Sequence, residues 1–367
     1  MQVKMVVTGG GSGGHIYPAL AIVDAMRRRD PDLEVLYIGT DHGLEKDLVT
    51  RAGIPFATIH ARGLLVHGWK AKLGGAVAAV RGLRDALILL SRYRPSVVVG
   101  TGGYVSGPVG LAAVMLHQPL VLQEQNVWPG FTNRKLSTHA TKVLVPFEEA
   151  KSNFPPRAPL TVVANPVTIS VTDSKAMIRD ELAMPRDAVV ILATGGSQGA
   201  KALNQFLLSW VSRLNDELDW GIFWMTGKRY YPEIKAQLGQ MTLDPKRVQV
   251  VEYFYQIQKY LRASDIFFGR AGAMSVADCA AFGLPAILVP SPNVSEDHQT
   301  RNAEVLVKRG AGYLVPEPQL PRRGASVLEK ILVDSELRDK MSKNVRGLFD
   351  PEAENKVVDA ILQAARV

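Results

Sequence analysis

Three glycine-rich stretches of the chain have the composition of phosphate-binding loops. Their sequences are TGGGSGGH over residues 8–15, GTGGYVSGPVG over 100–110 and TGGSQGA over 194–200. Glycine adopts positive φ and lets a backbone approach a ligand closely, and a helix that starts after such a loop offers N–H groups with a partial positive charge. This combination suits a phosphate, a diphosphate or a developing oxyanion. The candidate contacts in the first and third stretches are Ser12, Gly13, Gly14, Gly196, Ser197 and Gln198.

The first stretch also has the spacing G-x-G-x-x-G, at Gly9, Gly11 and Gly14. That spacing is typical of dinucleotide-binding enzymes, which also need an acidic residue at the end of the second strand for the ribose hydroxyls. Asp41 follows the predicted second strand slightly late, and His15 falls in the first helical turn, which must admit the pyrophosphate. From these residues alone, a nicotinamide-dependent oxidoreductase and a purely structural turn both remain open.

A second group of candidates lies in GRAGAMSVADCAAFGLPAILVPSP, residues 269–292. Its pattern predicts a strand, a tight turn, a helix and a strand. Asp278 lies inside the predicted helix, and its carboxylate has two oxygens that can accept both hydroxyls of a ribose. The alternative is that Asp278 only decorates the surface of the helix. In the next stretch, Gln299 and Asn302 are three residues apart and can share a helix face.

The hydrophobic pattern predicts the scaffold that positions these candidates. Short Val, Ile and Leu runs alternate with longer segments of helical period, which is typical of a parallel sheet covered on both faces. The runs of the first half are QVKMVV, LEVLYIG, FATIHA, SVVVG, LVLQEQ and KVLVP, and from about Asp187 a second series gives AVVILATGG, GIFWMTG, VQVVEYF, DIFFG and AILVPSP. We therefore predict an α/β protein of two doubly wound domains, with the glycine loops at the carboxyl ends of strands.

The length of the chain agrees with two domains. At 367 residues, it exceeds the size at which a single hydrophobic core usually stops growing. Residues 165–186 contain Pro166 and Pro185 and little regular periodicity, so we place the hinge there. The final segment, PEAENKVVDAILQAARV, is an amphipathic helix whose pattern does not decide which domain it covers.

The charge balance favours an anionic partner. The chain has 43 Lys and Arg against 35 Asp and Glu, a net charge of +8, which suits nucleic acid, an acidic membrane surface or a phosphorylated substrate. Cys279 is the only cysteine, which excludes an intramolecular disulfide and a cysteine metal cluster. The N-terminus lacks a signal-peptide pattern and no apolar run reaches about 20 residues, so we expect no export by that route and only peripheral membrane contact.

Seven motifs occur in an order that resembles the MurG family of peptidoglycan glycosyltransferases over nearly the whole chain. They are GGGSGGHIYPAL, GTGGYVSGP, QEQNVWPGFTN, ANPV, GGSQGAKALN, GRAGAMSVAD and EDHQTRNA. The resemblance implies a GT-B fold, in which two Rossmann-like domains face each other across a cleft and the final helix crosses back to the first domain. It implies an acceptor and membrane-facing domain at 1–164 with about 350–367, a hinge at 165–186 and a UDP-sugar-binding domain at 187–349.

The resemblance also implies a reaction. Such an enzyme transfers N-acetylglucosamine from UDP-N-acetylglucosamine to the C4 hydroxyl of the N-acetylmuramyl unit of lipid I, which gives lipid II. The transfer inverts the anomeric carbon and is expected to need no metal and no other cofactor. The expected partners are the two substrates and an anionic membrane surface, with no nucleic acid. The expected location is the cytoplasmic face of the bacterial cell membrane, where the protein is peripheral.

Residue by residue, the matching motifs imply donor and acceptor contacts. The implied UDP-N-acetylglucosamine contacts are Ser12, Gly13, Gly14, Asn126, Gly196, Ser197, Gln198, Phe254, Ala273, Met274, Ser275, Val276, Asp278 and Gln299. The implied acceptor contacts are Gly103, Tyr104 and Ser106. Three positions depart from the family, because Asp278 replaces the usual Glu, Thr168 stands where an Arg is common after ANPV, and Gln123 stands where His often precedes EQN.

An inverting transfer needs one general base on the acceptor hydroxyl and stabilisation of the departing UDP. His15 is the first candidate for the base because an unperturbed imidazole titrates near neutral pH, and Glu124 is its rival. A structural role for His15 in the loop is the alternative. The only D-x-D motif, Asp30 to Asp32, is interpreted as a turn at the opposite end of the second strand and not as a metal site.

Residues 62–94 fit a membrane-facing helix. Apolar residues recur there near helical spacing among basic residues, and Asp85 is the sole acid. A basic amphipathic helix of this type lies in the lipid interface and gains about 1 kcal/mol per basic residue near anionic lipid. The alternative is an ordinary helix whose apolar stripe faces the sheet. The expected membrane contacts are Trp69, Lys70, Lys72, Leu73, Arg81 and Arg84.

Overall fold

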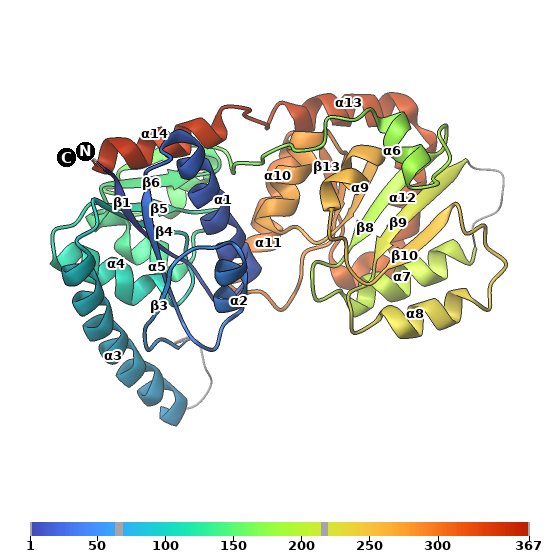
Figure 1. The fold of residues 1–367 in the computed structure, drawn as a ribbon. Coiled ribbons are helices and arrows are strands. Elements are labelled where there is room, and N and C mark those ends of the chain that lie inside the picture. The colour runs from blue at the N-terminus through green and yellow to red at the C-terminus, as the bar shows by residue number, and fades with distance from the viewer. Residues whose placement is uncertain (1, 63–68, 214–218, 366–367) are drawn as a thin grey trace. The chain divides into compact units, whose positions relative to one another are not determined.

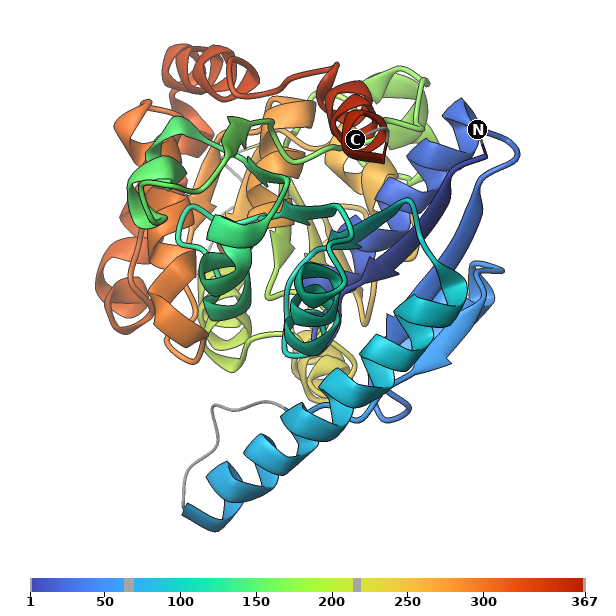
Figure 2. The same cartoon turned by 90° about the vertical axis from the view of Figure 1, so that its left-hand side faces the viewer.

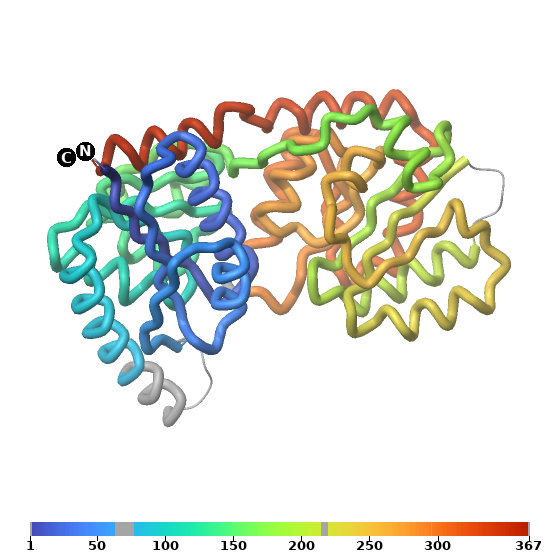
Figure 3. Tube along the Cα trace, in the orientation of Figure 1, coloured from blue at the N-terminus to red at the C-terminus, as the bar shows by residue number. Residues whose placement is uncertain are grey.

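The structure is a computed structural model that describes residues 2–62, 69–213 and 219–365 (Figures 1 and 3). The chain divides into two compact units. Unit 1 comprises residues 1–166 and 350–367, and unit 2 comprises residues 167–349. Each unit contains a parallel sheet with helices on its faces, so the predicted class of two doubly wound α/β domains is confirmed.

Within the described residues, unit 1 has a seven-stranded sheet in the order β3-β2-β1-β4-β5-β6-β7, and all neighbouring strands are parallel. The strands are β1 (Lys4–Thr8), β2 (Glu34–Gly39), β3 (Phe56–Thr58), β4 (Val97–Gly100), β5 (Leu120–Gln123), β6 (Lys142–Val145) and β7 (Leu160–Val162). The helices are α1 (Gly13–Arg29), α2 (Leu44–Arg51), α3 (Trp69–Tyr93), α4 (Ser106–Met115), α5 (Phe131–Leu136) and α14 (Ala353–Ala365), with short 3-10 helices at Ser137–His139 and Glu148–Asn153.

Helices cover both faces of the unit 1 sheet. Successive strand residues point to opposite faces. Met5 and Val7 of β1 therefore belong to a core with α1 and α14. Val6 points to the other face and belongs to a core with α3 and α4. Figure 2 shows the long helix α3 along this side of unit 1. Val357 and Ile361 of α14 are buried in the first of these cores, so the final helix packs on unit 1. Burial on both faces explains the near-continuous apolar runs of the strands.

Unit 2 has a six-stranded parallel sheet in the order β10-β9-β8-β11-β12-β13 over its described residues. The strands are β8 (Val189–Thr194), β9 (Trp220–Met225), β10 (Val248–Val251), β11 (Ile266–Gly269), β12 (Ala286–Leu288) and β13 (Gly312–Leu314). The helices are α6 (Lys175–Glu181), α7 (Lys201–Val211), α8 (Tyr231–Leu238), α9 (Ile257–Ala263), α10 (Ala273–Phe282), α11 (His298–Lys308), α12 (Ala325–Val333) and α13 (Ser335–Arg346), with short helical turns at Ser295–Asp297, Glu317–Gln319 and Leu320–Gly324.

Most of the segment that the sequence suggested as a hinge belongs to unit 2. The division between the units falls after Pro166, and residues 167–186 include α6. Ser174 caps this helix, because its hydroxyl accepts a hydrogen bond from Met177 N at 3.3 Å. α6 has only seven residues, which is why its periodicity did not stand out in the sequence.

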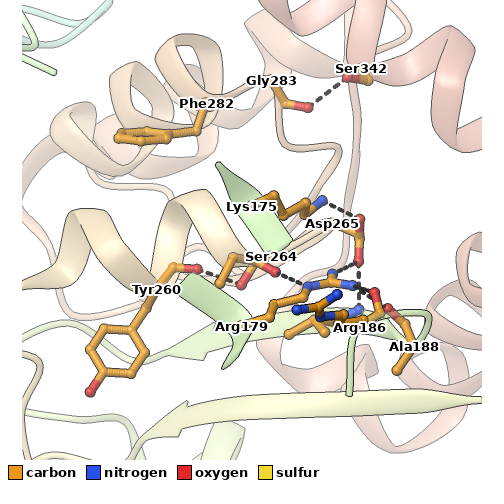
Figure 4. Close-up of polar contacts among 12 residues, drawn as sticks. Lys175, Arg179, Arg186, Ala188, Tyr260, Ser264, Asp265, Phe282, Gly283 and Ser342 are labelled. Carbon is orange, nitrogen blue, oxygen red and sulfur yellow. Dashed lines mark hydrogen bonds and ion pairs between the residues drawn. The ribbon is translucent and has the colours of Figure 1, made fainter. Parts of the chain in front are cut away.

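A polar cluster around Asp265 fixes α6 to the unit 2 sheet (Figure 4). The Asp265 carboxylate accepts hydrogen bonds from Arg179 Nη2 at 2.6 Å and from Val190 N at 2.7 Å, and it pairs with Lys175. Arg179 is 4% exposed. Its guanidinium also donates to three carbonyl groups, those of Ala263, Arg186 and Ala188. The buried cation is thus fully paired, which a buried charge requires.

We predict that Arg179→Met lowers the free energy of unfolding of unit 2 by about 3 kcal/mol, because three carbonyl groups lose the Arg179 guanidinium as donor and Asp265 loses one of its partners. The matched control is Arg186→Met, which removes an exposed pair with Asp180 and should leave stability nearly unchanged. Urea denaturation followed by tryptophan fluorescence measures both, since tryptophan side chains fill the unit 2 core. Equal losses in the two variants would contradict the anchoring role of Arg179.

Candidate active site

Each sheet reverses its strand order at one place, and glycine loops lie there. In unit 1 the reversal falls between β1 and β4, which lead into residues 9–12 and 101–105. In unit 2 it falls between β8 and β11, which lead into residues 195–200 and 270–272. Open parallel sheets bind ligands beside the carboxyl ends of the strands at such a reversal. One candidate site therefore lies on each unit.

The two glycine loops of unit 1 are in direct backbone contact. Gly10 N donates to the carbonyl oxygen of Gly102 at 3.3 Å. A Cβ atom added at Gly103 would lie only 2.0 Å from Gly10 O, and Gly102 and Gly103 have φ of +108° and +84°. Any side chain at Gly103 would therefore force the loops apart, and the positive φ also favours glycine.

His15 lies in the first turn of α1, against the second glycine loop. Its ring Nδ1 is 3.0 Å from the carbonyl oxygen of Thr101 and 3.2 Å from Gln125 Oε1. A Cβ atom on Gly102 would lie 2.9 Å from ring atoms of His15, so this glycine leaves the space that the imidazole fills. The side chain is half-buried, and one edge of its ring is held by oxygen atoms. The structure thus positions His15 at the strand reversal, beside both glycine loops.

A buried carboxylate lies beside the first glycine loop at the end of β2. Glu45 Oε1 accepts hydrogen bonds from Thr40 N at 3.2 Å and Thr40 Oγ1 at 2.6 Å. A Cβ atom on Gly10 would lie 2.9 Å from the same oxygen, so the carboxylate packs against the loop backbone. Asp41, the residue that a dinucleotide site would need, is exposed and pairs with His42. The arrangement does not support the dinucleotide alternative.

Glu124 clamps the loop that follows β5. Its Oε1 accepts from Gln125 N, Asn126 N and Asn126 Nδ2 at 3.0–3.1 Å, and its Oε2 accepts from Gly130 N and Asn133 Nδ2 at 3.1 and 3.0 Å. The side chain is 1% exposed. Five N–H donors therefore occupy both oxygens, and no face of this carboxylate is left open to take a proton from a substrate.

Ser12, Gly13 and Gly14 form the edge of the unit 1 site. Ser12 and Gly14 are exposed, and the Ser12 hydroxyl makes no capping hydrogen bond. His15 N donates to Ser12 O at 3.1 Å, whereas the first N–H groups of a helix generally lack an acceptor within it, so the backbone at Gly13 and Gly14 suits an anion. Asn126 is half-buried, and its amide is partly engaged by Glu124, as described above.

The predicted acceptor residues after β4 have structural contacts of their own. The buried Ser106 hydroxyl donates to the carbonyl oxygens of Thr8 and Gly102 at 3.1 and 2.8 Å. Its side chain therefore supports the loops and does not face a ligand. Tyr104 is half-buried with its hydroxyl 3.4 Å from Thr40 Oγ1, and its ring lies where a Cβ on Gly11 would fall.

The D-x-D motif lies at the amino end of β2. Asp30 is the C-terminal cap residue of α1, and its Oδ1 accepts a hydrogen bond from Asp32 N at 3.2 Å. This is the local bonding of a turn, so the interpretation of the motif as a turn is confirmed. Across the described ranges, no group of three or more His, Cys, Asp and Glu residues is arranged to hold a metal ion.

In unit 2 the loop between β8 and α7 projects two side chains into solvent. Ser197 and Gln198 are exposed, whereas Gly199 has φ of +73° and approaches the next loop closely. A Cβ atom on Gly199 would lie 2.0 Å from Thr226 O. Gly196 N donates to Thr194 Oγ1 at 3.0 Å. The glycines thus fix the backbone of the loop, whereas the side chains of Ser197 and Gln198 are exposed to solvent.

The start of α10 and Asp278 make up the other half of the unit 2 site. Ala273, Met274 and Ser275 occupy the first turn of α10, and all three are half-buried. Val276 is buried, so its side chain packs in the core. Asp278 keeps part of its surface exposed, but the surrounding protein desolvates its carboxylate and raises the pKa to about 7.

Three side chains hold the loops around this site. Arg270 donates to the carbonyl oxygens of Val289 and Pro290 at 3.1 and 3.0 Å and pairs with Glu317. Asn302 Nδ2 donates to Ala271 O at 3.2 Å, and Gln299 Oε1 accepts from Ser291 N at 2.8 Å. Sequence reasoning missed Arg270 and Glu317, although an Arg directly after a strand in GRAGAM was a usable signal. Gln299 supports the loop with its side-chain oxygen.

The prediction for Phe254 needs correction. Its side chain is 4% exposed and packs against Tyr260, with ring centroids 4.1 Å apart. The ring is buried in unit 2, where the segment after β10 folds back against Tyr260 of α9. Tyr255 is 84% exposed, and it contacts Tyr253 edge to face.

α3 has one face in the core and another in solvent. Ala86 and Leu90 are buried, whereas Val80 is 70% exposed and lies near the exposed Arg81 and Arg84. The predicted contacts Trp69, Lys70, Lys72 and Leu73 have side chains outside the described part of the structure. Among the described helices, none is both long and apolar enough to pass through a bilayer.

Comparison with known proteins places this chain in a family. The family described as glycosyltransferase family 28 N-terminal domain matches residues 5–145, and the corresponding C-terminal domain matches residues 190–361. A relative from Symbiobacterium thermophilum is 39% identical over 99% of this chain and 97% of its own length, and one from Desulforudis audaxviator is 38% identical over 99% of each. Both are named UDP-N-acetylglucosamine–N-acetylmuramyl-(pentapeptide) pyrophosphoryl-undecaprenol N-acetylglucosamine transferase.

Solved structures agree with this relationship. The crystal structure of Acinetobacter baumannii MurG has a TM-score of 0.81 and 30% identity over 99% of this chain and 100% of that chain. A calicheamicin glycosyltransferase has a TM-score of 0.70 and 19% identity over 99% and 98%, a likeness of fold alone. This chain belongs to glycosyltransferase family 28 and is a glycosyltransferase.

Proposed function

We propose that this family 28 glycosyltransferase transfers N-acetylglucosamine from UDP-N-acetylglucosamine to the C4 hydroxyl of the N-acetylmuramyl unit of lipid I, which forms lipid II for peptidoglycan. The observation that carries the proposal is identity of 37–39% along nearly the full chain to several relatives named for this transfer. The strand-reversal sites of the two units support it, because one offers a candidate base and the other a candidate ribose ligand.

In this proposal the unit 2 site binds the donor. The first turn of α10 supplies N–H groups for the diphosphate, and the Asp278 carboxylate accepts the ribose hydroxyls. Ser197 and Gln198 supply further donors toward the diphosphate and the sugar, and Gln299 offers its NH₂ group to a sugar hydroxyl. Backbone N–H groups and helix N-termini then stabilise the departing UDP without a metal.

The unit 1 site takes the acceptor, and His15 takes the proton of the acceptor hydroxyl. One displacement at the anomeric carbon inverts its configuration, so a single base is sufficient. The contacts of Glu124 favour His15, because five N–H donors already occupy that carboxylate. Glu124 instead holds the loop that carries Asn126 and Gln125.

The reaction is tested with purified protein, UDP-N-acetylglucosamine and a lipid I analogue. We expect UDP release that depends on the acceptor and is unchanged by EDTA.

Two variants test the choice of base. We expect His15→Ala to lower kcat by about 10²-fold or more with stability retained, and Glu124→Ala to lower the free energy of unfolding. Absence of acceptor-dependent UDP release would refute the proposed reaction. Near wild-type kcat in His15→Ala, together with a folded Glu124→Ala that loses 10²-fold, would reverse the choice of base.

Donor binding should depend on pH through Asp278. Because the pKa of this carboxyl is raised to about 7, protonation below pH 7 removes the charged acceptor that the ribose hydroxyls need. We predict that the affinity for UDP-N-acetylglucosamine falls about tenfold per pH unit below pH 7 and is constant well above it. Isothermal titration without acceptor measures this, and Asp278→Asn is the control that should flatten the dependence. An equal slope in both proteins would rule out Asp278 as the titrating ligand.

In this proposal the protein acts as a peripheral protein at the cytoplasmic face of the membrane. The exposed Val80, Arg81 and Arg84 of α3 support contact with an anionic lipid surface. We predict binding to vesicles that contain anionic phospholipid, weakened by salt and by the double change Arg81→Ala and Arg84→Ala. Vesicles of zwitterionic lipid are the control. Vesicle binding that is independent of anionic lipid content and salt, and that is unchanged in the double variant, would contradict this contact.

A further inference from the structure

The orientation of the Gln125 side chain is fixed by the oxygens around it. Its Nε2 lies 3.0 Å from Thr101 O and 3.0 Å from Gln123 O, and it also contacts Gln123 Oε1. Carbonyl oxygens only accept hydrogen bonds, so the amide nitrogen must be the end that faces them. The other end of the amide, Oε1, therefore faces His15 Nδ1 at 3.2 Å.

His15 Nδ1 consequently faces two acceptors. One is Gln125 Oε1 and the other is Thr101 O at 3.0 Å, and neither can donate. In a neutral imidazole one nitrogen carries the proton and the other has the lone pair, and the hydrogen bond at one nitrogen selects the tautomer. Nδ1 must then carry the proton, which leaves the lone pair on Nε2.

We propose that Gln125 is a positioning residue that holds neutral His15 in the Nδ1–H tautomer and makes Nε2 the proton acceptor. Gln125 acts twice, since its Oε1 accepts from Nδ1 and its Nε2 binds the Thr101 carbonyl that is the second acceptor. Serine hydrolase triads use a carboxylate for this orientation. The Gln125 amide orients the ring without placing a formal charge beside it.

The amide of Gln125 is itself held by a buried network. Gln123 Nε2 donates to Asn165 Oδ1 at 3.2 Å, and Asn165 Nδ2 donates to Gln125 O at 2.8 Å. The three side chains are 2%, 1% and 7% exposed for Gln123, Gln125 and Asn165. Rotation of the Gln125 amide would bring its NH₂ group toward Nδ1 and its oxygen toward three other oxygens, which a buried site resists. Gln123, which departs from the family pattern, thus supplies two of the three oxygens that orient Gln125.

The role of Gln125 rests on the proposed function, because it matters for catalysis only if His15 is the base. The tautomer of His15 can be measured without any activity. Ring-nitrogen NMR of the full ¹⁵N-labelled chain, with the His15 signals found by comparison with His15→Gln, distinguishes a protonated from an unprotonated nitrogen at a pH where the ring is neutral. We expect a protonated Nδ1 and an unprotonated Nε2. A protonated Nε2 in the unmodified protein would overturn the proposal, and this test needs no folded Gln125 variant.

The matched variants are Gln125→Met and Gln118→Met. Gln118 is a half-buried glutamine of unit 1 that donates to Leu90 O and lies outside the site. We expect Gln125→Met to give a mixture of His15 tautomers and to lower kcat by about tenfold or more, with KM for the donor within about twofold. Gln118→Met should change neither. An unchanged tautomer and kcat in Gln125→Met would overturn the positioning role. The expected tautomer in a protein without transferase activity would refute the proposed function and leave the geometry of Gln125 intact.

Discussion

The contact between two glycine backbones is the constraint on which the unit 1 site depends. Gly103 approaches Gly10 O so closely that a Cβ atom there would lie 2.0 Å away. This approach fixes where the second loop runs and hence where the Thr101 carbonyl points. That carbonyl contacts both His15 and Gln125, so a displaced loop would move the imidazole and its partner together. These glycines therefore help to set the position of the His15 imidazole.

The same sheet plan serves different chemistry in unit 2. There Gly199 approaches Thr226 O as Gly103 approaches Gly10 O, and a helix again starts beside the strand reversal. The side chain at this reversal is the carboxyl of Asp278, in place of an imidazole. Desolvation brings its pKa to about 7, which makes it sensitive to pH in the range where the enzyme would work. The strand order thus determines where each candidate site lies, and the side chains there determine its chemical character.

The pattern of apolar runs was sufficient to predict two doubly wound sheets, because strands buried on both faces are nearly continuously apolar. The position of His15 in the first turn after a strand-end loop also followed, as did that of Asp278 inside the helix after the next such loop of unit 2. Features that depend on distant partners could not be predicted. The five donors of Glu124, the burial of Phe254 and the Asp265 anchor of α6 arise from tertiary contacts. For the same reason, the pattern of α14 showed an apolar face but not that it packs on unit 1.

The proposed reaction is a single displacement in which His15 is the only proton acceptor. The most direct measurement is the anomeric configuration of N-acetylglucosamine in the product, read from the proton coupling of its anomeric carbon in an NMR spectrum. A single inverting displacement gives a β linkage from the α-linked donor. A product with the α configuration would show that the acceptor is added to the face from which UDP departs, and it would exclude this displacement.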